Sequence, residues 1–174
     1  MRSIKAFALG LTVLVGPADA LELPWPFADA LKLPFDSYVR PVNDNPQGLS
    51  ASDCDGDGIP DLISANFDSD TATIFRNSGP GTLLHESTLA TADKPSGVTC
   101  ADFNNDGRMD AAVSSWTDRT VTLYLRQEDG SFKVGGTSAV GNFPRSVSAA
   151  DLDLDGNVDL VVANSQSSDL TLLF

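Results

Sequence analysis

Short apolar runs alternate with polar turns along most of the chain. In the middle of the sequence, residues 97–101 and 111–115 are short runs of small and apolar residues, and 120–125 alternates threonine with apolar residues. A looser stretch of the same kind covers 132–140. Such alternation is typical of half-buried strands. Because no window keeps a helical period over three turns, we expect an all-β chain.

The pattern recurs at a constant spacing of 49 residues, without insertion or deletion. Four short strands in a repeat of about 40–50 residues are typical of a propeller blade. We therefore predict β-propeller-type repeats at 46–94, 95–143 and 144–174, the last lacking its fourth strand. The anchors of the repeat are Pro46, Pro95, Pro144, Asp53, Asp102, Asp151, Gly58, Gly107, Gly156, Asp61, Asp110 and Asp159.

Each copy contains an acidic loop of nine residues, at 53–61, 102–110 and 151–159. Loop positions 1, 3, 5 and 9 carry Asp or Asn in all three copies, and position 6 is always Gly. Carboxylates crowded into so short a loop repel one another unless a cation offsets their charge. Ca²⁺ takes about six to eight oxygen ligands in a flexible shell, and position 7 can add a backbone carbonyl. The loops therefore predict calcium sites.

An EF-hand, a magnesium site and a soft-metal site fit these loops less well. An EF-hand needs an acid at position 12 and two flanking helices, whereas position 12 here is Ser64, Val113 or Val162. Mg²⁺ prefers to keep its waters, and soft metals are disfavoured because no loop contains histidine. An Asp- and Gly-rich turn without metal is the remaining alternative.

These loops, each followed by a Leu/Val-rich strand, resemble FG-GAP or VCBS repeats, the calcium-bearing blades of integrin alpha-subunit propellers and of many bacterial secreted proteins. The resemblance covers roughly 46–174. It implies that the acidic loop joins the first two strands of each blade and that up to three Ca²⁺ ions bind. With Asn104 in place of an acid, the middle site is expected to be the weakest. The implied ligands are Asp53, Asp55, Asp57, Ile59, Asp61, Asp102, Asn104, Asp106, Arg108, Asp110, Asp151, Asp153, Asp155, Asn157 and Asp159, with Ile59, Arg108 and Asn157 contributing backbone carbonyls.

The N-terminus has the features of a secretory signal peptide. Arg2 and Lys5 precede an apolar run at 6–15, and Ala18-Asp19-Ala20 fits a cleavage site. We predict a signal peptide at 1–20 and a secreted or periplasmic protein, with a buried N-terminal strand or helix as the alternative. A leader at 21–45 follows, within which 33–43 is a candidate for the strand that the last blade lacks.

The net charge excludes two classes of partner, and the cysteine content leaves two states of the cysteines open. The 174 residues include 11 Lys+Arg and 24 Asp+Glu, a net charge of −13. This charge disfavours nucleic acid and anionic lipid as partners. No further apolar stretch is long enough to span a membrane. Cys54 and Cys100 form either one disulfide or two buried thiols.

No nucleophile motif surrounds His85, so we predict no enzyme activity. We expect an extracellular interaction or adhesion module that binds protein or glycan. The alternatives are a lectin or polysaccharide-processing enzyme, and a vestigial fragment of a longer propeller. Trp116 is either a sugar-stacking platform or an aromatic packed between blades.

The number of blades bears on the assembly. Closed propellers use about four to eight blades, whereas the sequence predicts three. Two copies would complete a six-bladed ring, so we expect a homodimer. An open arc capped by a partner is the alternative, along with the vestigial fragment.

Overall fold

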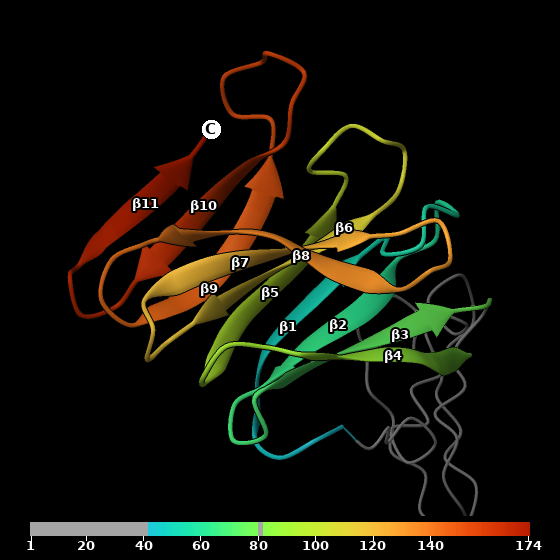
Figure 1. The fold of residues 1–174 in the computed structure, drawn as a ribbon, viewed down its shortest axis with the longest axis horizontal. Coiled ribbons are helices and arrows are strands. Elements are labelled where there is room, and N and C mark those ends of the chain that lie inside the picture. The colour runs from blue at the N-terminus through green and yellow to red at the C-terminus, as the bar shows by residue number, and fades with distance from the viewer. Residues whose placement is uncertain (1–41, 80–81) are drawn as a thin grey trace, which may run out of the picture. The chain divides into compact units, whose positions relative to one another are not determined.

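The computed structural model describes residues 42–79 and 82–174, and these residues form eleven strands in three antiparallel sheets (Figure 1). The first sheet, in the order β1-β2-β3-β4, consists of β1 (Pro46–Ser52), β2 (Asp61–Asn66), β3 (Thr71–Asn77) and β4 (Leu83–Ala90). The second, β5-β6-β7-β8, consists of β5 (Pro95–Ala101), β6 (Asp110–Ser115), β7 (Thr120–Arg126) and β8 (Phe132–Ala139). The third, β11-β10-β9, consists of β9 (Pro144–Ala150), β10 (Asp159–Asn164) and β11 (Asp169–Leu173). The prediction of an all-β fold with two complete blades and an incomplete third is confirmed.

The strands of the middle blade agree with the apolar pattern to within two residues. The largest difference is at β5, which begins at Pro95 rather than at Gly97. Proline is tolerated as the first residue of a strand, and here it is buried. The acidic loop joins the first two strands of every blade, as the resemblance implies.

The blades pack face to face, and we call each contact between neighbouring blades a seam. Successive side chains of a strand point to opposite faces of the sheet. Each blade therefore has a rear face toward the preceding blade and a forward face toward the following one. The first seam includes Ile63, Ala65, Ala72 and Ile74 on the forward side and Val98, Ala111, Val113 and Tyr124 on the rear side. The second includes Ala112 and Val121 on the forward side and Val147, Leu160 and Val162 on the rear side.

Trp116 lies in these seams, at the end opposite the acidic loops. Its ring is 5.0 Å from that of Phe67 and 5.2 Å from that of Phe143, centroid to centroid. The Arg145 guanidinium stacks 4.1 Å from the Trp116 ring centroid. Of the two alternatives for Trp116, the structure shows the aromatic packed between blades.

Two sequence predictions concern residues at the N-terminus. The signal peptide (1–20) and most of the candidate strand at 33–43 lie outside the described residues, so both stay predictions. Residues 42 and 43, which are described, are not in a strand. Within the described residues, no helix is long and apolar enough to cross a membrane.

Candidate metal centre

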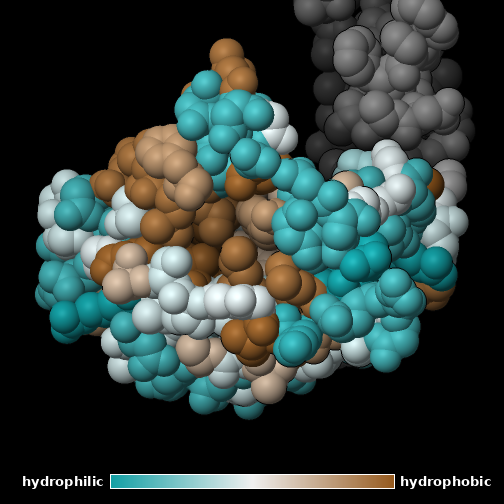
Figure 2. Space-filling model, turned by 45° about the horizontal axis from the view of Figure 1, so that its top comes forward, coloured by the Kyte–Doolittle hydropathy of each residue, from teal (hydrophilic) through white to brown (hydrophobic). Residues whose placement is uncertain are grey.

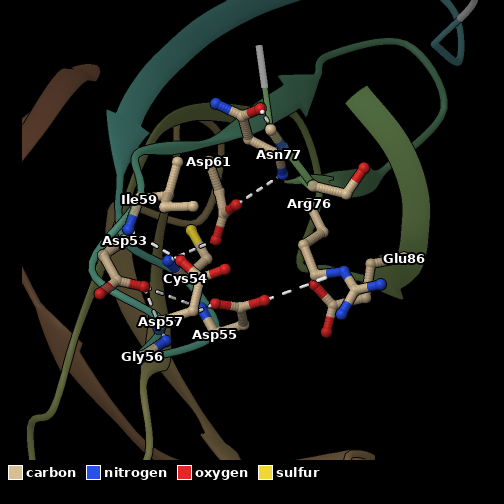
Figure 3. Close-up of polar contacts among 12 residues, drawn as sticks. Asp53, Cys54, Asp55, Gly56, Asp57, Ile59, Asp61, Arg76, Asn77 and Glu86 are labelled. Carbon is tan, nitrogen blue, oxygen red and sulfur yellow. Dashed lines mark hydrogen bonds and ion pairs between the residues drawn. The ribbon is translucent and has the colours of Figure 1, made fainter. Parts of the chain in front are cut away.

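The first residue of each acidic loop organises the turn by accepting backbone hydrogen bonds. Asp53 Oδ1 accepts from the amide of Gly56 at 2.6 Å, and Oδ2 accepts from that of Gly58 at 2.9 Å. Both glycines have positive φ, 86° and 83°, which favours glycine because it lacks a Cβ. These bonds fold the loop back so that its carboxylates converge (Figure 3).

The last residue of each loop, at position 9, is a buried aspartate that clamps the loop to the blade. Asp61 is fully buried. Its Oδ2 accepts from the Cys54 amide at 2.8 Å, and its Oδ1 accepts from the Asn77 amide at 2.7 Å (Figure 3). In the middle blade, Asp110 accepts from the amides of Phe103 and Arg126 in the same way. Asn77 and Arg126 are the last residues of the third strands of their blades. The sequence pattern did not predict that their amides would bind the loop.

Two of the three loops bring carboxylates together. Asp53, Asp55 and Asp61 each place one oxygen within 4.8 Å of the others. The third loop does the same with the equivalent residues Asp151, Asp153 and Asp159. The structure therefore gathers positions 1, 3 and 9 of the predicted ligand set in these loops.

The gathered groups do not include the predicted ligands at positions 5 and 7. Asp57 and Asp155 are not in the gathered groups; each accepts a hydrogen bond from the amide at position 7, Ile59 at 2.7 Å and Asn157 at 2.8 Å. The carbonyl ligands predicted at Ile59, Arg108 and Asn157 stay predictions.

The carboxylates of the first loop repel one another. Burial raises the pKa of Asp55, and the charges of Asp61, Asp57 and Glu86 raise it further, against the lowering effect of the Asp57 amide. The Arg76 side chain pairs with this carboxylate, its Nε 3.9 Å from Asp55 Oδ2 (Figure 3), and Arg126 Nη2 donates to the Cys54 carbonyl at 3.0 Å. A bound cation would remove this repulsion.

The third loop contains a carboxylate oxygen without a partner. Asp151 Oδ2 accepts from the Gly156 amide at 3.0 Å, whereas Oδ1 is buried and has no hydrogen-bond partner among the described residues. An unsatisfied buried acceptor costs about 1–3 kcal/mol, and more when it is charged. This oxygen belongs to the residue that begins the gathered group, so a hard cation fits the donor set.

In the middle loop, one acid is paired with a basic side chain of the same loop. Its acids do not form a gathered group among the described residues. Asp106 Oδ2 accepts from Asn104 Nδ2 at 2.9 Å and from Arg108 Nη2 at 2.5 Å. Although burial acts in the opposite direction, these bonds and that of the Arg108 amide lower the pKa of Asp106. The sequence prediction used only the Arg108 carbonyl and missed this ion pair, which the basic side chain two residues after Asp106 could have signalled.

A disulfide ties the first loop to the second blade. Cys54, at loop position 2, is bonded to Cys100 of β5, with 5.3 Å between the Cα atoms. Both residues are buried. The structure thus contains the first of the two alternatives left open for these cysteines.

Comparisons with known proteins extend this picture. The chain resembles a functionally unknown protein from Desulfotomaculum acetoxidans, with a TM-score of 0.52 and 18% identity, over 77% of this chain and 43% of that one. It also resembles the periplasmic gluconolactonase of Pseudomonas aeruginosa, with a TM-score of 0.50 and 23% identity, over 76% of this chain and 36% of that one. The chain thus spans less than half the length of either protein, and the likeness shows the fold alone.

Sequence comparison gives a family. No curated protein matches the chain. The FG-GAP-like repeat matches residues 53–113 and 111–162, so the matched region contains all three acidic loops. Because these matches cover more than half of the 174 residues, the chain belongs to the FG-GAP-like repeat family.

Proposed function

We propose that this chain is an extracytoplasmic calcium-binding repeat protein, in which the first and third acidic loops hold Ca²⁺ and the middle loop binds it more weakly. The observation that carries the proposal is the orphaned Oδ1 of Asp151 beside two further gathered carboxylates. In the first loop, Asp53, Asp55 and Asp61 are arranged in the same way.

The bound ion supplies positive charge among the gathered carboxylates. Positions 1, 3 and 9 contribute the gathered oxygens, and the backbone amides of the loop hold those carboxylates in place. Extracellular calcium modules have Kd values of about 10⁻⁴–10⁻³ M. A site at 100-fold saturation adds about 2.7 kcal/mol to the free energy of unfolding. The ions are therefore structural.

The disulfide and the predicted signal peptide support an extracytoplasmic location. Disulfides persist in oxidising compartments such as the periplasm and the cell exterior, and Cys54 and Cys100 form one here. In this setting we propose that the blades act as an interaction or adhesion module for an extracellular protein or glycan. N-terminal sequencing of exported protein tests the location: a start at Leu21 is expected, and an intact Met1 contradicts it.

Calorimetric titration tests the calcium proposal. Titration of metal-free protein with Ca²⁺ is expected to give about two sites in the range of extracellular modules. Asp53→Asn and Asp151→Asn should each remove one site. Asp118→Asn, which changes an exposed turn outside the loops, should remove none. EDTA should lower the melting temperature of the unmodified protein by about 5 °C or more. No measurable binding, or melting indifferent to EDTA, contradicts the proposal.

A further inference from the structure

Cys54 is linked to every member of the first group of gathered carboxylates. It follows Asp53 and precedes Asp55 in the loop, and its amide donates to Asp61 Oδ2 at 2.8 Å. These three aspartates are the ones whose oxygens lie within 4.8 Å of one another. The position of this one residue therefore affects all three candidate ligands.

Cys54 is held by the second blade at two further atoms. Its sulfur is bonded to that of Cys100 in β5. Its carbonyl oxygen accepts a hydrogen bond from Arg126 Nη2 of β7 at 3.0 Å. The amide of Cys54 thus binds within its own loop, whereas its side chain and carbonyl are fixed from the neighbouring blade.

Arg126 is itself held in one orientation. Its side chain is only 12% exposed and donates from Nη1 to Glu86 Oε1 of β4 at 2.8 Å. Its Nε donates to the carbonyl of Met109, at position 8 of the middle loop, at 3.3 Å. The guanidinium also lies 4.8 Å from the ring centroid of Phe132. A planar guanidinium carries enough donors to make these bonds at once, so Arg126 joins the first loop, the middle loop and β4.

The first and middle loops also lie against each other beside these bonds. A Cβ on Gly56 would be 4.0 Å from Met109 Cγ. Figure 2, which brings the top of Figure 1 forward, shows many hydrophilic side chains on this side of the molecule. Cys54 is by contrast only 1% exposed. The contacts of Cys54 with the second blade are therefore shielded from competing water.

We infer that the second blade positions the metal ligands of the first acidic loop, with Arg126 and the disulfide from Cys54 to Cys100 as the positioning groups. The inference rests on the proposed calcium function. Groups that orient metal ligands without touching the metal typically contribute about 10–100-fold to metal affinity. Holding Cys54 restricts the metal-free loop, so that less conformational freedom is lost when the ion binds. The affinity of the first site thus depends on a contact between blades.

The third loop provides a reference within the same molecule. It gathers the equivalent carboxylates, and its position 2 is Leu152, whose amide donates to Asp159 Oδ2 at 2.8 Å. Leucine cannot form a disulfide, and the contacts of Arg126 given above all lie in the first two blades. The third site should therefore not depend on the two positioning groups.

Calorimetric titration with Ca²⁺ in two backgrounds tests the inference. Asp151→Asn leaves the first site to be measured, and Asp53→Asn leaves the third. Arg126→Lys is introduced into both, because lysine keeps the charge beside Glu86 but lacks the fork that also reaches the Cys54 carbonyl. The Kd of the first site is expected to rise about tenfold and that of the third to stay unchanged. The double variant Cys54→Ala/Cys100→Ala should show the same selective loss.

Arg145→Lys is the matched control. Arg145 also contacts a neighbouring blade, through its stacking on Trp116, but at the end opposite the acidic loops. This variant should change neither Kd. Circular dichroism melting verifies that each variant is folded, and if the cysteine variant is not, Arg126→Lys decides.

Three outcomes contradict the inference in different ways. An unchanged first-site Kd in Arg126→Lys overturns it. So does an equal loss of affinity at both sites, since that would assign Arg126 to general stability. If neither background binds Ca²⁺ before Arg126 is changed, the proposed calcium function is itself wrong, and the inference is wrong with it.

Discussion

A Cβ atom built on Gly97 of β5 would lie 2.8 Å from the amide nitrogen of Val147 in the next blade. Gly48 stands in the same relation to the second blade, where a Cβ would clash with the Ser96 carbonyl oxygen. These are backbone atoms, which cannot swing away as a flexible side chain could. The inner strands of neighbouring blades therefore approach closely only because glycine occupies these positions.

Gly97→Ala should consequently destabilise the protein. We expect the free energy of unfolding to fall by about 1–3 kcal/mol, the usual cost of overpacking. Gly136→Ala in β8 is the control, because a Cβ there meets no atom within 4 Å. It should be neutral or stabilising by up to about 1 kcal/mol. Urea unfolding of both variants measures the difference in the free energy of unfolding. Equal stabilities would show that the neighbouring strand shifts at little cost to make room for the Cβ.

Leu154 in the third acidic loop adopts a conformation that leucine rarely takes. It has φ of 64°, and the equivalent residues are Gly56 and Asn105, also with positive φ. Leu154 is 85% exposed, so it gains little burial in return. Left-handed backbone costs a residue such as leucine about 1–2 kcal/mol.

Leu154→Asn should therefore stabilise the protein by about 0.5–1 kcal/mol, because asparagine tolerates this conformation better. Leu152→Asn, in the same loop but without positive φ, is the matched control and should give no such gain. Thermal unfolding in excess EDTA isolates the backbone effect from metal binding. A loss of stability on Leu154→Asn contradicts this account of the strain.

The sequence predicted the strands well because their apolar alternation is local. The runs at 111–115 and 120–125 match β6 and β7 to within one residue at each end. The seam contact of Gly97 was not predictable, because it depends on a strand in the next blade. The ion pair of Arg108 with Asp106 was missed because the prediction considered only the backbone carbonyl of Arg108 and not its charged side chain.

The same limit applies to the acidic loops. Position and residue type indicated four side-chain ligands per loop, and the structure gathers three in the first and third loops. The acids at position 5, Asp57 and Asp155, lie outside these groups, because side-chain placement depends on loop backbone geometry, which the repeat spacing does not specify. Their role as ligands stays a prediction.

Tyr124 should make stability fall at alkaline pH. Its side chain is buried in the first seam, and burial raises its pKa above the ordinary 10.0 despite a hydrogen bond with the Ala92 backbone. Because the folded-state pKa is the higher one, the contribution is fully present below pH 10. It is lost as the pH rises from there through the folded-state pKa.

Tyr124→Phe should flatten this part of the pH profile, because phenylalanine has no proton to lose. Urea unfolding at a series of pH values from neutral to alkaline gives the slope for both proteins. An unchanged alkaline slope in the variant would assign the loss to another group.

The middle acidic loop should become a strong calcium site when its composition is made that of the third. The difference at the relevant positions is Asn104 for Asp153 and Arg108 for Asn157. Arg108 now neutralises Asp106 through an ion pair, and Asn104 lacks the charge that attracts a cation. The double variant Asn104→Asp/Arg108→Asn removes both obstacles. Its titration should give about three sites of similar affinity in place of two, following the charge dependence of calcium affinity.

The single variants and a control complete the experiment. Arg108→Asn alone should raise the affinity of the middle loop less than the double variant does, because Asn104 remains uncharged. Arg119→Asn, which removes a positive charge from an exposed turn outside the loop, should leave the stoichiometry unchanged. If the double variant still binds only two ions while the first and third loops bind normally, the weakness of the middle loop lies in its backbone geometry rather than in its charge.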